Sequence, residues 1–142
     1  MANEDALPDP ARVVIRRRIE WMDTDAAGIW HWTAAFRLAE AAEAAMHTAL
    51  GIAGITFGAC PRASVSASFS KALRFNDLVD VELAVDSIGR SSLVYRLAIA
   101  SEGEPVAEGS LTVVFIDRSS GRAEPWPAAI RERLAEGGRV AE

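Results

Sequence analysis

Cysteine is almost missing from this chain. Cys60 is the single cysteine among 142 residues, so the sequence allows no intramolecular disulfide and no zinc site built from several cysteines. We expect this thiol to be a small buried side chain, and we predict no metal site.

Long apolar runs and a basic excess are missing as well. The first ten residues, MANEDALPDP, are acidic and contain nothing that fits a secretory signal or a membrane span, so we expect a cytoplasmic protein without a membrane partner. The net charge of −5 argues against binding to nucleic acid. Any polyanionic ligand would need a local basic patch.

The residues that are present suit one well-packed domain. Half of them are hydrophobic and a quarter are charged, as in ordinary globular proteins. At this length we predict a single domain over residues 11–136, with flexible tails at 1–10 and 137–142.

One alanine-rich segment and five strand-like segments define the expected elements. Residues 33–50, TAAFRLAEAAEAAMHTAL, lack glycine and proline and are followed by Gly51, which predicts one long helix. Apolar residues that are β-branched or alternate with polar ones predict strands at 12–21, 63–70, 78–88, 91–100 and 109–117. The links between the last four strands are short and rich in turn residues, so consecutive strands should pair antiparallel. A short helix should follow within 125–136. The predicted fold class is α+β, with a curved antiparallel sheet of about five strands wrapped around one long central helix.

Three segments resemble the hot-dog-fold thioesterases, in the 4-hydroxybenzoyl-CoA thioesterase branch. They are RIEWMDTDAAGIWHW before the helix, ASFSKALRFNDLVDVELAVDSIGRSSLVYRLAI, and AEGSLTVVFIDRSSGRAEPWP, and the resemblance runs from Arg12 to Leu134. It implies hydrolysis of an aromatic or a short- to medium-chain acyl-CoA to the free acid and coenzyme A. No cofactor is implied beyond the coenzyme A of the substrate. The resemblance also implies homodimers whose sheets join, or homotetramers made of two such dimers, with each active site built between subunits.

The resemblance assigns roles to single residues. Asp25 matches the catalytic aspartate, Gly28 matches the glycine of its turn, and the backbone N–H of Trp32 faces the thioester oxygen. Arg90 and Ser91, in GRSS, fall where relatives contact the nucleotide end of coenzyme A.

Three further residues are expected to line the substrate pocket. Trp30 and His31 belong to the stretch that shapes it, and His31 and Trp32 differ from the residues of many relatives, which leaves the acyl group open. The glycine-rich segment 52–62 contains Phe57 and should form the rim of the acyl pocket.

Physical chemistry supports this reading of the motif. A helix N-terminus offers unpaired N–H groups and about half a positive charge, which suits the oxyanion of thioester hydrolysis. Asp25 lies seven residues before Trp32 and can reach the same carbonyl. We expect Trp30 and Trp32 to desolvate Asp25 and raise its pKa, so that it acts as nucleophile or as general base.

Simpler roles compete for several of these residues. Asp25 can cap a turn, and Asp23 is expected to be a loop acid bonded to backbone. His47 lies late in the helix, where a cation suits the dipole, and we expect a structural role for it. Of Glu40 and Glu43, we expect one to be exposed and the other to bond to a neighbouring strand or subunit.

Two other functions compete with hydrolysis. A hot-dog hydratase acting on enoyl-CoA uses an aspartate and a histidine with four residues between them, whereas five separate Asp25 from His31. A non-catalytic acyl-binding protein is the other alternative. An acyl-carrier protein can also present the thioester, although two acidic partners repel each other.

Overall fold

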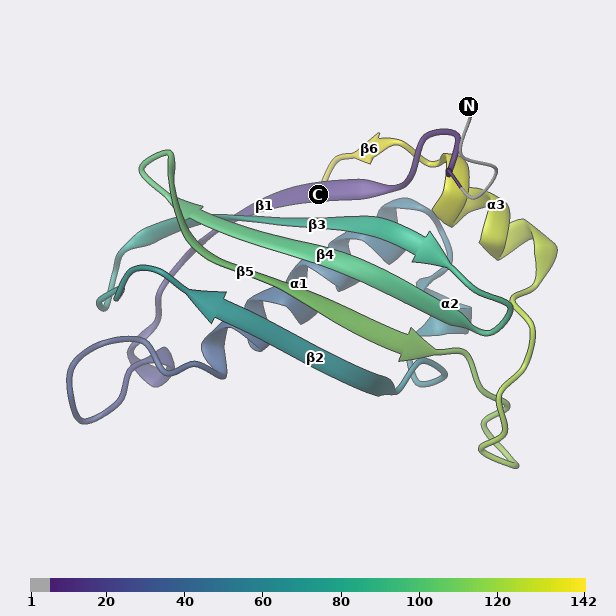
Figure 1. Ribbon diagram of the computed structural model, residues 1–142, viewed down its shortest axis with the longest axis horizontal. Helices are drawn as coiled ribbons and strands as arrows, with labels where there is room; N and C mark the ends of the chain where they lie inside the picture. The colour runs from purple at the N-terminus through teal and green to yellow at the C-terminus, as the bar shows by residue number, and fades with distance from the viewer. Residues whose placement is uncertain (1–5) are drawn as a thin grey trace.

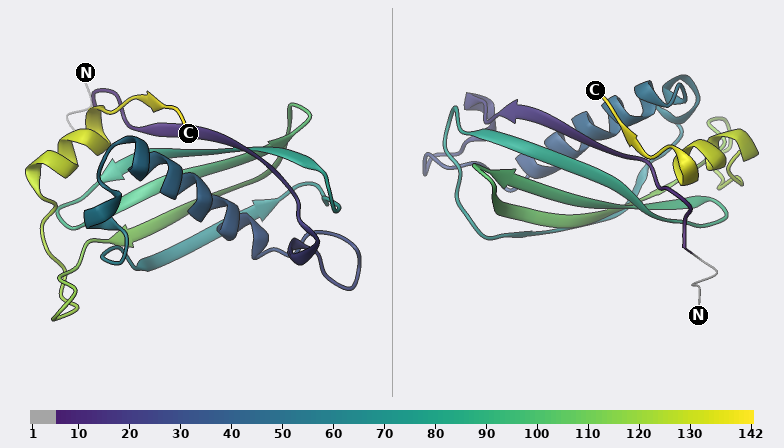
Figure 2. Two further views of the ribbon diagram at one scale, coloured as in Figure 1. Left: turned by 180° about the vertical axis from the view of Figure 1, so that it is seen from behind. Right: turned by 90° about the horizontal axis from the view of Figure 1, so that it is seen from above.

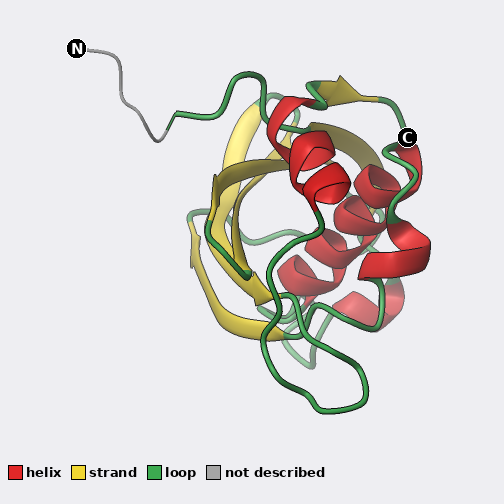
Figure 3. Cartoon of the chain, turned by 90° about the vertical axis from the view of Figure 1, so that its right-hand side faces the viewer, coloured by secondary structure: helices red, strands yellow, loops and turns green. Residues whose placement is uncertain are grey.

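The computed structural model describes residues 6–142. They form one sheet that curves toward the helices, which lie on one of its sides (Figures 1 and 3). This confirms the predicted α+β class. In chain order the elements are β1 (Arg12–Arg18), the 3-10 turn η1 (Trp21–Asp23), α1 (Ala34–Ala49), α2 (Ala53–Thr56), β2 (Arg62–Phe69), β3 (Leu78–Ile88), β4 (Ser92–Ser101), β5 (Glu104–Val114), α3 (Ala128–Glu136) and β6 (Arg139–Val140).

The sheet order is β2-β5-β4-β3-β1-β6, which corrects one expectation. The short links do make β3, β4 and β5 an antiparallel meander, but β2 pairs with β5 and β1 pairs with β3. The link between β2 and β3 is held away from a hairpin because its backbone bonds elsewhere. Leu73 accepts from Trp30 N–H at 2.8 Å, and Asn76 N–H donates to Ile19 at 2.8 Å.

The predicted long helix is α1, which lies across the inner face of the sheet (Figure 2). Thr33 and Leu50 flank it, and Gly51 follows with a φ of 72°, as the predicted glycine stop requires. Its small residues allow the strands to approach closely, because Ala35, Ala39 and Ala42 are fully buried against them. The inward residues of the central strands alternate as predicted and complete the core: Val79, Val81, Leu83 and Val85 on β3, and Leu93, Tyr95, Leu97 and Ile99 on β4.

The chain ends differ in part from the predicted tails. Residues 1–5 lie outside the described part. Residues 139–140, expected in a flexible tail, form β6 and pair with β1 in parallel, which also makes six strands rather than about five. Asp9 N–H donates to Ala135 at 3.1 Å, so this part of the expected N-terminal tail is attached to α3.

The edge strand β2 departs from its predicted packing. The alternation of Val65, Ala67 and Phe69 with serines in the sequence predicts one packed face, yet Val65 and Phe69 are 46% and 40% exposed. The reason is its position, since β2 borders the sheet and only β5 adjoins it within residues 6–142. No helix in this same part of the chain is long and apolar enough to span a membrane.

Candidate active site

The loop between η1 and α1 carries the predicted catalytic motif and forms a tight turn. Thr24 and Trp30 form an antiparallel bridge, and Asp25 N–H donates to Ile29 at 3.0 Å. Gly28 N–H donates back to the Asp25 carbonyl at 2.9 Å. Gly28 has a φ of 78°, which explains why glycine occupies this position of the turn.

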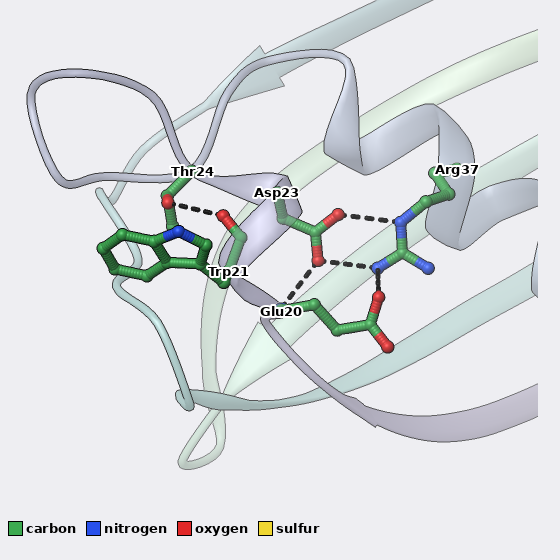
Figure 4. A network of polar contacts seen from close by, with 5 residues as sticks. All are labelled: Glu20, Trp21, Asp23, Thr24 and Arg37. Carbon is green, nitrogen blue, oxygen red and sulfur yellow. Dashed lines mark hydrogen bonds and ion pairs between the residues drawn. The ribbon is translucent and has the colours of Figure 1, made fainter.

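A buried ion pair fixes this loop to α1 (Figure 4). The Asp23 side chain is only 2% exposed and receives Arg37 Nε at 2.7 Å and Nη2 at 2.6 Å. Glu20 N–H donates to the same carboxylate at 2.8 Å. Asp23 is therefore bonded to backbone as predicted, but its main partner is Arg37, which the sequence reasoning missed. Nothing in the spacing of these two residues distinguishes the arginine from its exposed neighbours on the helix.

Burial and pairing shift the pKa of the Asp23 carboxyl group in opposite directions. Burial alone would raise the pKa of Asp23, but the hydrogen bonds and charge of Arg37, with the Glu20 backbone, hold the pKa below its ordinary value. Asp23 is thus ionised in its structural role. It holds the loop and the start of α1 together, since His31 N–H also donates to the Asp23 carbonyl at 2.6 Å.

Asp25 caps its own turn and is exposed. Its Oδ1 accepts Ala27 N–H at 2.8 Å, the capping role that competed with catalysis. Within the described residues Oδ2 has no hydrogen-bond partner, so the same side chain can cap the turn and still present an oxygen to a substrate.

The structure corrects the expectation that Trp30 and Trp32 form a wall around Asp25. Trp30 is 5% exposed and packs edge-on against Phe69, with ring centroids 5.4 Å apart, so it belongs to the core. Trp32 is 59% exposed and contacts Phe36 instead. A single chain therefore leaves the Asp25 carboxylate in water, because the core takes one indole and the other lies open.

The start of α1 presents a free donor next to this turn. Among the residues that the structure describes, the N–H of Trp32 has no acceptor, while Ala34 N–H bonds to the His31 carbonyl at 2.9 Å. His31 Nδ1 receives Thr33 N–H at 3.2 Å and lies 2.8 Å from the Thr33 hydroxyl. The His31 ring therefore caps the helix with Nδ1 as an acceptor, which gives the neutral ring its proton on Nε2.

The other predicted site residues lie at the opposite end of the sheet. Arg90 and Ser91 occupy the β3–β4 turn, where Arg131 donates to Gly89 at 2.8 Å, whereas the Asp25 loop adjoins the segment that enters β3 (Figure 1). β3 has eleven residues and is roughly 35 Å long. Phe57 follows α2 and contacts the ring of His47 near the end of α1. One chain thus brings together five of the predicted site residues, Asp25, Gly28, Trp30, His31 and Trp32. Phe57, Arg90 and Ser91 lie away from them.

A pocket of about 240 Å³ opens between α1, α2 and the start of β2. A buried ion pair lies in its wall, since Glu43 has a side chain 7% exposed and accepts Arg62 Nη1 at 2.8 Å. Glu40 is exposed, so the prediction that one of the two glutamates would bond to a neighbouring strand is confirmed for Glu43. The expected buried Cys60 is only half-buried and borders this pocket, where burial raises the pKa of its thiol to about 12.

His47 has a structural role, but not as a cation. It is 1% exposed, with Nδ1 2.6 Å from the Thr56 hydroxyl and Nε2 2.6 Å from the Tyr95 hydroxyl. Burial lowers the pKa of His47 below 6.5 despite the nearby carboxylate of Glu43. The expectation of a cation at the helix end is therefore wrong, because the imidazole is in the core.

Because His47 is buried, we predict that its contribution to the stability of the fold decreases in acid. The unfolded chain binds a proton at His47 more readily than the folded chain, so the stabilisation is complete above about pH 6.5 and is lost as the pH falls toward the lower folded pKa. We expect His47→Gln to be less stable at pH 7.5 but to lose less further stability at pH 5.5 than the wild type. Urea unfolding at both pH values measures this, and an equal loss in the two proteins would contradict it.

Comparisons with known proteins find solved structures that share the fold of this chain. A gentisyl-coenzyme A thioesterase is 23% identical with a TM-score of 0.76, covering 87% of this chain and 99% of its own. A 1,4-dihydroxy-2-naphthoyl-CoA thioesterase from Synechocystis is 16% identical with a TM-score of 0.78, covering 87% and 95%. A thioesterase from Thermus thermophilus, solved with coenzyme A and zinc, is 25% identical with a TM-score of 0.77, covering 85% and 90%.

These structures show that the chain has the hot-dog fold. The model of the thioesterase-like superfamily matches residues 19–134, and the chain belongs to that superfamily as a thioester hydrolase. Comparison with curated proteins finds no similar sequence. The described residues contain no group of three or more histidine, cysteine, aspartate or glutamate side chains able to hold a metal.

Proposed function

We propose that this protein is an acyl-CoA thioesterase that releases coenzyme A and a free acid from an aromatic or a short- to medium-chain acyl-CoA. The observation that carries the proposal is the N–H of Trp32 at the start of α1, which has no acceptor among residues 6–142 and lies in the same loop as the exposed carboxylate of Asp25. The N–H donates to the thioester oxygen as negative charge develops on it, and the helix dipole adds to this stabilisation.

Asp25 supplies the second half of the chemistry. In one route its free carboxylate oxygen attacks the thioester carbon and expels the thiolate of coenzyme A, and water then hydrolyses the mixed anhydride to the free acid, which restores Asp25 and supplies the proton for the thiol. In the other route Asp25 takes a proton from a water that attacks the same carbon, and this proton passes to the departing thiolate. Its capping bond to Ala27 N–H holds the side chain in one orientation, which supports either route.

The structural neighbours support a particular acyl group and carrier. Two structural neighbours act on aromatic acyl-CoA esters, which supports an aromatic acyl group here. The neighbour solved with coenzyme A supports coenzyme A as the carrier. Arg90 and Ser91 are proposed to contact its nucleotide end, and Phe57 is proposed to line the acyl pocket.

A panel of acyl-CoA esters tests the proposed function. We expect thiol release from at least one benzoyl or medium-chain ester, followed with a thiol reagent, and no hydration of crotonyl-CoA. Hydration without hydrolysis would favour the hydratase alternative. Binding without any turnover would favour the non-catalytic alternative.

The proposed enzyme acts as a homodimer, alone or as half of a homotetramer. A twofold axis can pair β2 with its own copy antiparallel, which removes the open edge and covers Val65 and Phe69. In that pairing the Arg62 end of one strand lies beside the Phe69 end of the other. Because Phe69 contacts Trp30, the partner's catalytic loop approaches the pocket beside Arg62.

A variant with a charged residue on the edge strand β2 tests this assembly. Val65→Lys should shift the protein toward monomer, because burying an unpaired ammonium between two copies is unfavourable, and activity should fall with the dimer. Sedimentation velocity measures the state, with Glu132→Lys on the exposed side of α3 as the control. An unchanged dimer in Val65→Lys would exclude this edge as the interface.

A further inference from the structure

The peptide group between His31 and Trp32 is fixed in one orientation by hydrogen bonds of its neighbours. The His31 carbonyl accepts Ala34 N–H at 2.9 Å, and His31 N–H donates to the Asp23 carbonyl at 2.6 Å. A trans peptide is planar, and its N–H points away from its C=O. Because the His31 carbonyl faces Ala34, the Trp32 N–H points away from the helix. The direction of the proposed oxyanion donor therefore depends on how His31 is held.

The His31 side chain adds a further bond to this arrangement. Its Nδ1 accepts Thr33 N–H at 3.2 Å and lies 2.8 Å from the Thr33 hydroxyl. An imidazole nitrogen accepts a hydrogen bond only when it carries no proton. Protonation of His31 therefore breaks the bond from Thr33 N–H, and it places a positive charge at the positive end of the helix dipole. Both effects push the ring away from the helix start.

The charged groups around the loop do not compete for this ring. They lie on the loop and on the segments that contact it: Glu20, Asp23, Asp25, Arg37 and Arg74. Arg37 pairs with both Glu20 and Asp23 (Figure 4). Arg74 Nη1 lies 4.0 Å from the position that a Cβ on Gly28 would take. Among residues 6–142 none of these groups bonds to the His31 ring, so protonation acts through its contact with Thr33.

We propose that His31 is a positioning residue whose neutral ring keeps the Trp32 N–H aimed at the thioester oxygen, and that protonation of the ring switches this donor off. This inference rests on the proposed thioesterase function and deepens it, because it adds a control by pH to the same site. His31 itself does not touch the reacting atoms in this assignment. It acts through Thr33 and the peptide that it shares with Trp32.

Two substitutions of His31 test the proposal at pH 8.0. His31→Ala removes the acceptor, so we expect kcat for acyl-CoA hydrolysis to fall by at least about tenfold, with KM within about threefold of the wild type. His31→Asn retains an acceptor, since a side-chain carbonyl can accept the N–H two residues further on, as Asp25 Oδ1 does from Ala27. We expect its kcat to return to within about threefold of the wild type.

The pH profile separates positioning from a merely structural role. Asparagine cannot be protonated, so between pH 8.0 and pH 5.5 we expect kcat of the wild type to fall by about tenfold more than kcat of His31→Asn. Any protonation of Asp25 in acid is common to both proteins and cancels in this ratio. His47→Gln replaces the only other histidine and should keep the acid fall of the wild type. Thermal unfolding at each pH verifies that the proteins remain folded.

The outcomes distinguish this inference from the proposed function. An equal acid fall in the wild type and His31→Asn, or wild-type kcat in His31→Ala, overturns the role of His31 alone. A kcat that rises in acid overturns it as well, because the imidazolium would then help to stabilise the oxyanion. Absence of thiol release from every ester of the panel overturns the thioesterase function and this inference with it.

Discussion

Replacing Asp25 by asparagine is expected to lower kcat for acyl-CoA hydrolysis about a thousandfold, because the amide can neither attack the thioester nor take a proton. The fold should be retained, since the asparagine carbonyl oxygen can still accept the Ala27 N–H that caps the turn. Stopped-time thiol assays of kcat, with thermal unfolding measured on the same samples, check both parts of this expectation.

Asp117 provides a matched control for this substitution. Its Oδ1 caps another exposed turn, where it accepts the N–H groups of Ser119 and Ser120 at 2.8 Å. Asp117→Asn makes the same chemical change in a similar turn, and we expect kcat to be unchanged. If Asp25→Asn kept activity within about threefold of the wild type, the chemistry would have to be assigned to another residue.

Removing Arg37 is expected to have the largest effect on stability. Arg37→Met keeps the aliphatic stem but leaves the Asp23 carboxylate buried without its two charge-assisted bonds. We expect the free energy of unfolding at pH 7 to fall by about 2–3 kcal/mol, less than for a fully buried pair because Arg37 is partly exposed. Urea unfolding measures the loss. Asp23→Asn in the same chain should recover part of it, because no uncompensated charge then remains.

The pH dependence of this loss has a definite sign. Pairing holds the pKa of Asp23 below 3.8, so its stabilisation is complete above that value and disappears as the pH falls through the folded pKa. The difference between the wild type and Arg37→Met should therefore shrink in strong acid. Arg16→Met removes an exposed ion pair with Asp80 and should change stability little. A similarly small effect of Arg37→Met would contradict the role given to the network in Figure 4.

The candidate site could be predicted only where it depends on local sequence. The turn around Asp25 and Gly28 and the helix start after Trp32 follow from residues adjacent in the chain, because turns and caps are formed by neighbours. Arg37 and Arg62 were missed, since an arginine on a helix or a strand looks the same in sequence whether it faces water or a buried carboxylate.

Sequence alone determined the long helix of this protein and the inward faces of its central strands. The alanine-rich segment without glycine or proline made α1, and the alternation in β3 and β4 set which residues would be buried, because both depend on local periodicity. Tertiary structure decided which strands pair and which side chains contact each other. It paired β2 with β5, placed Trp30 in the core and Trp32 in water, and brought Glu43 to Arg62, because these contacts depend on packing between segments distant in the chain.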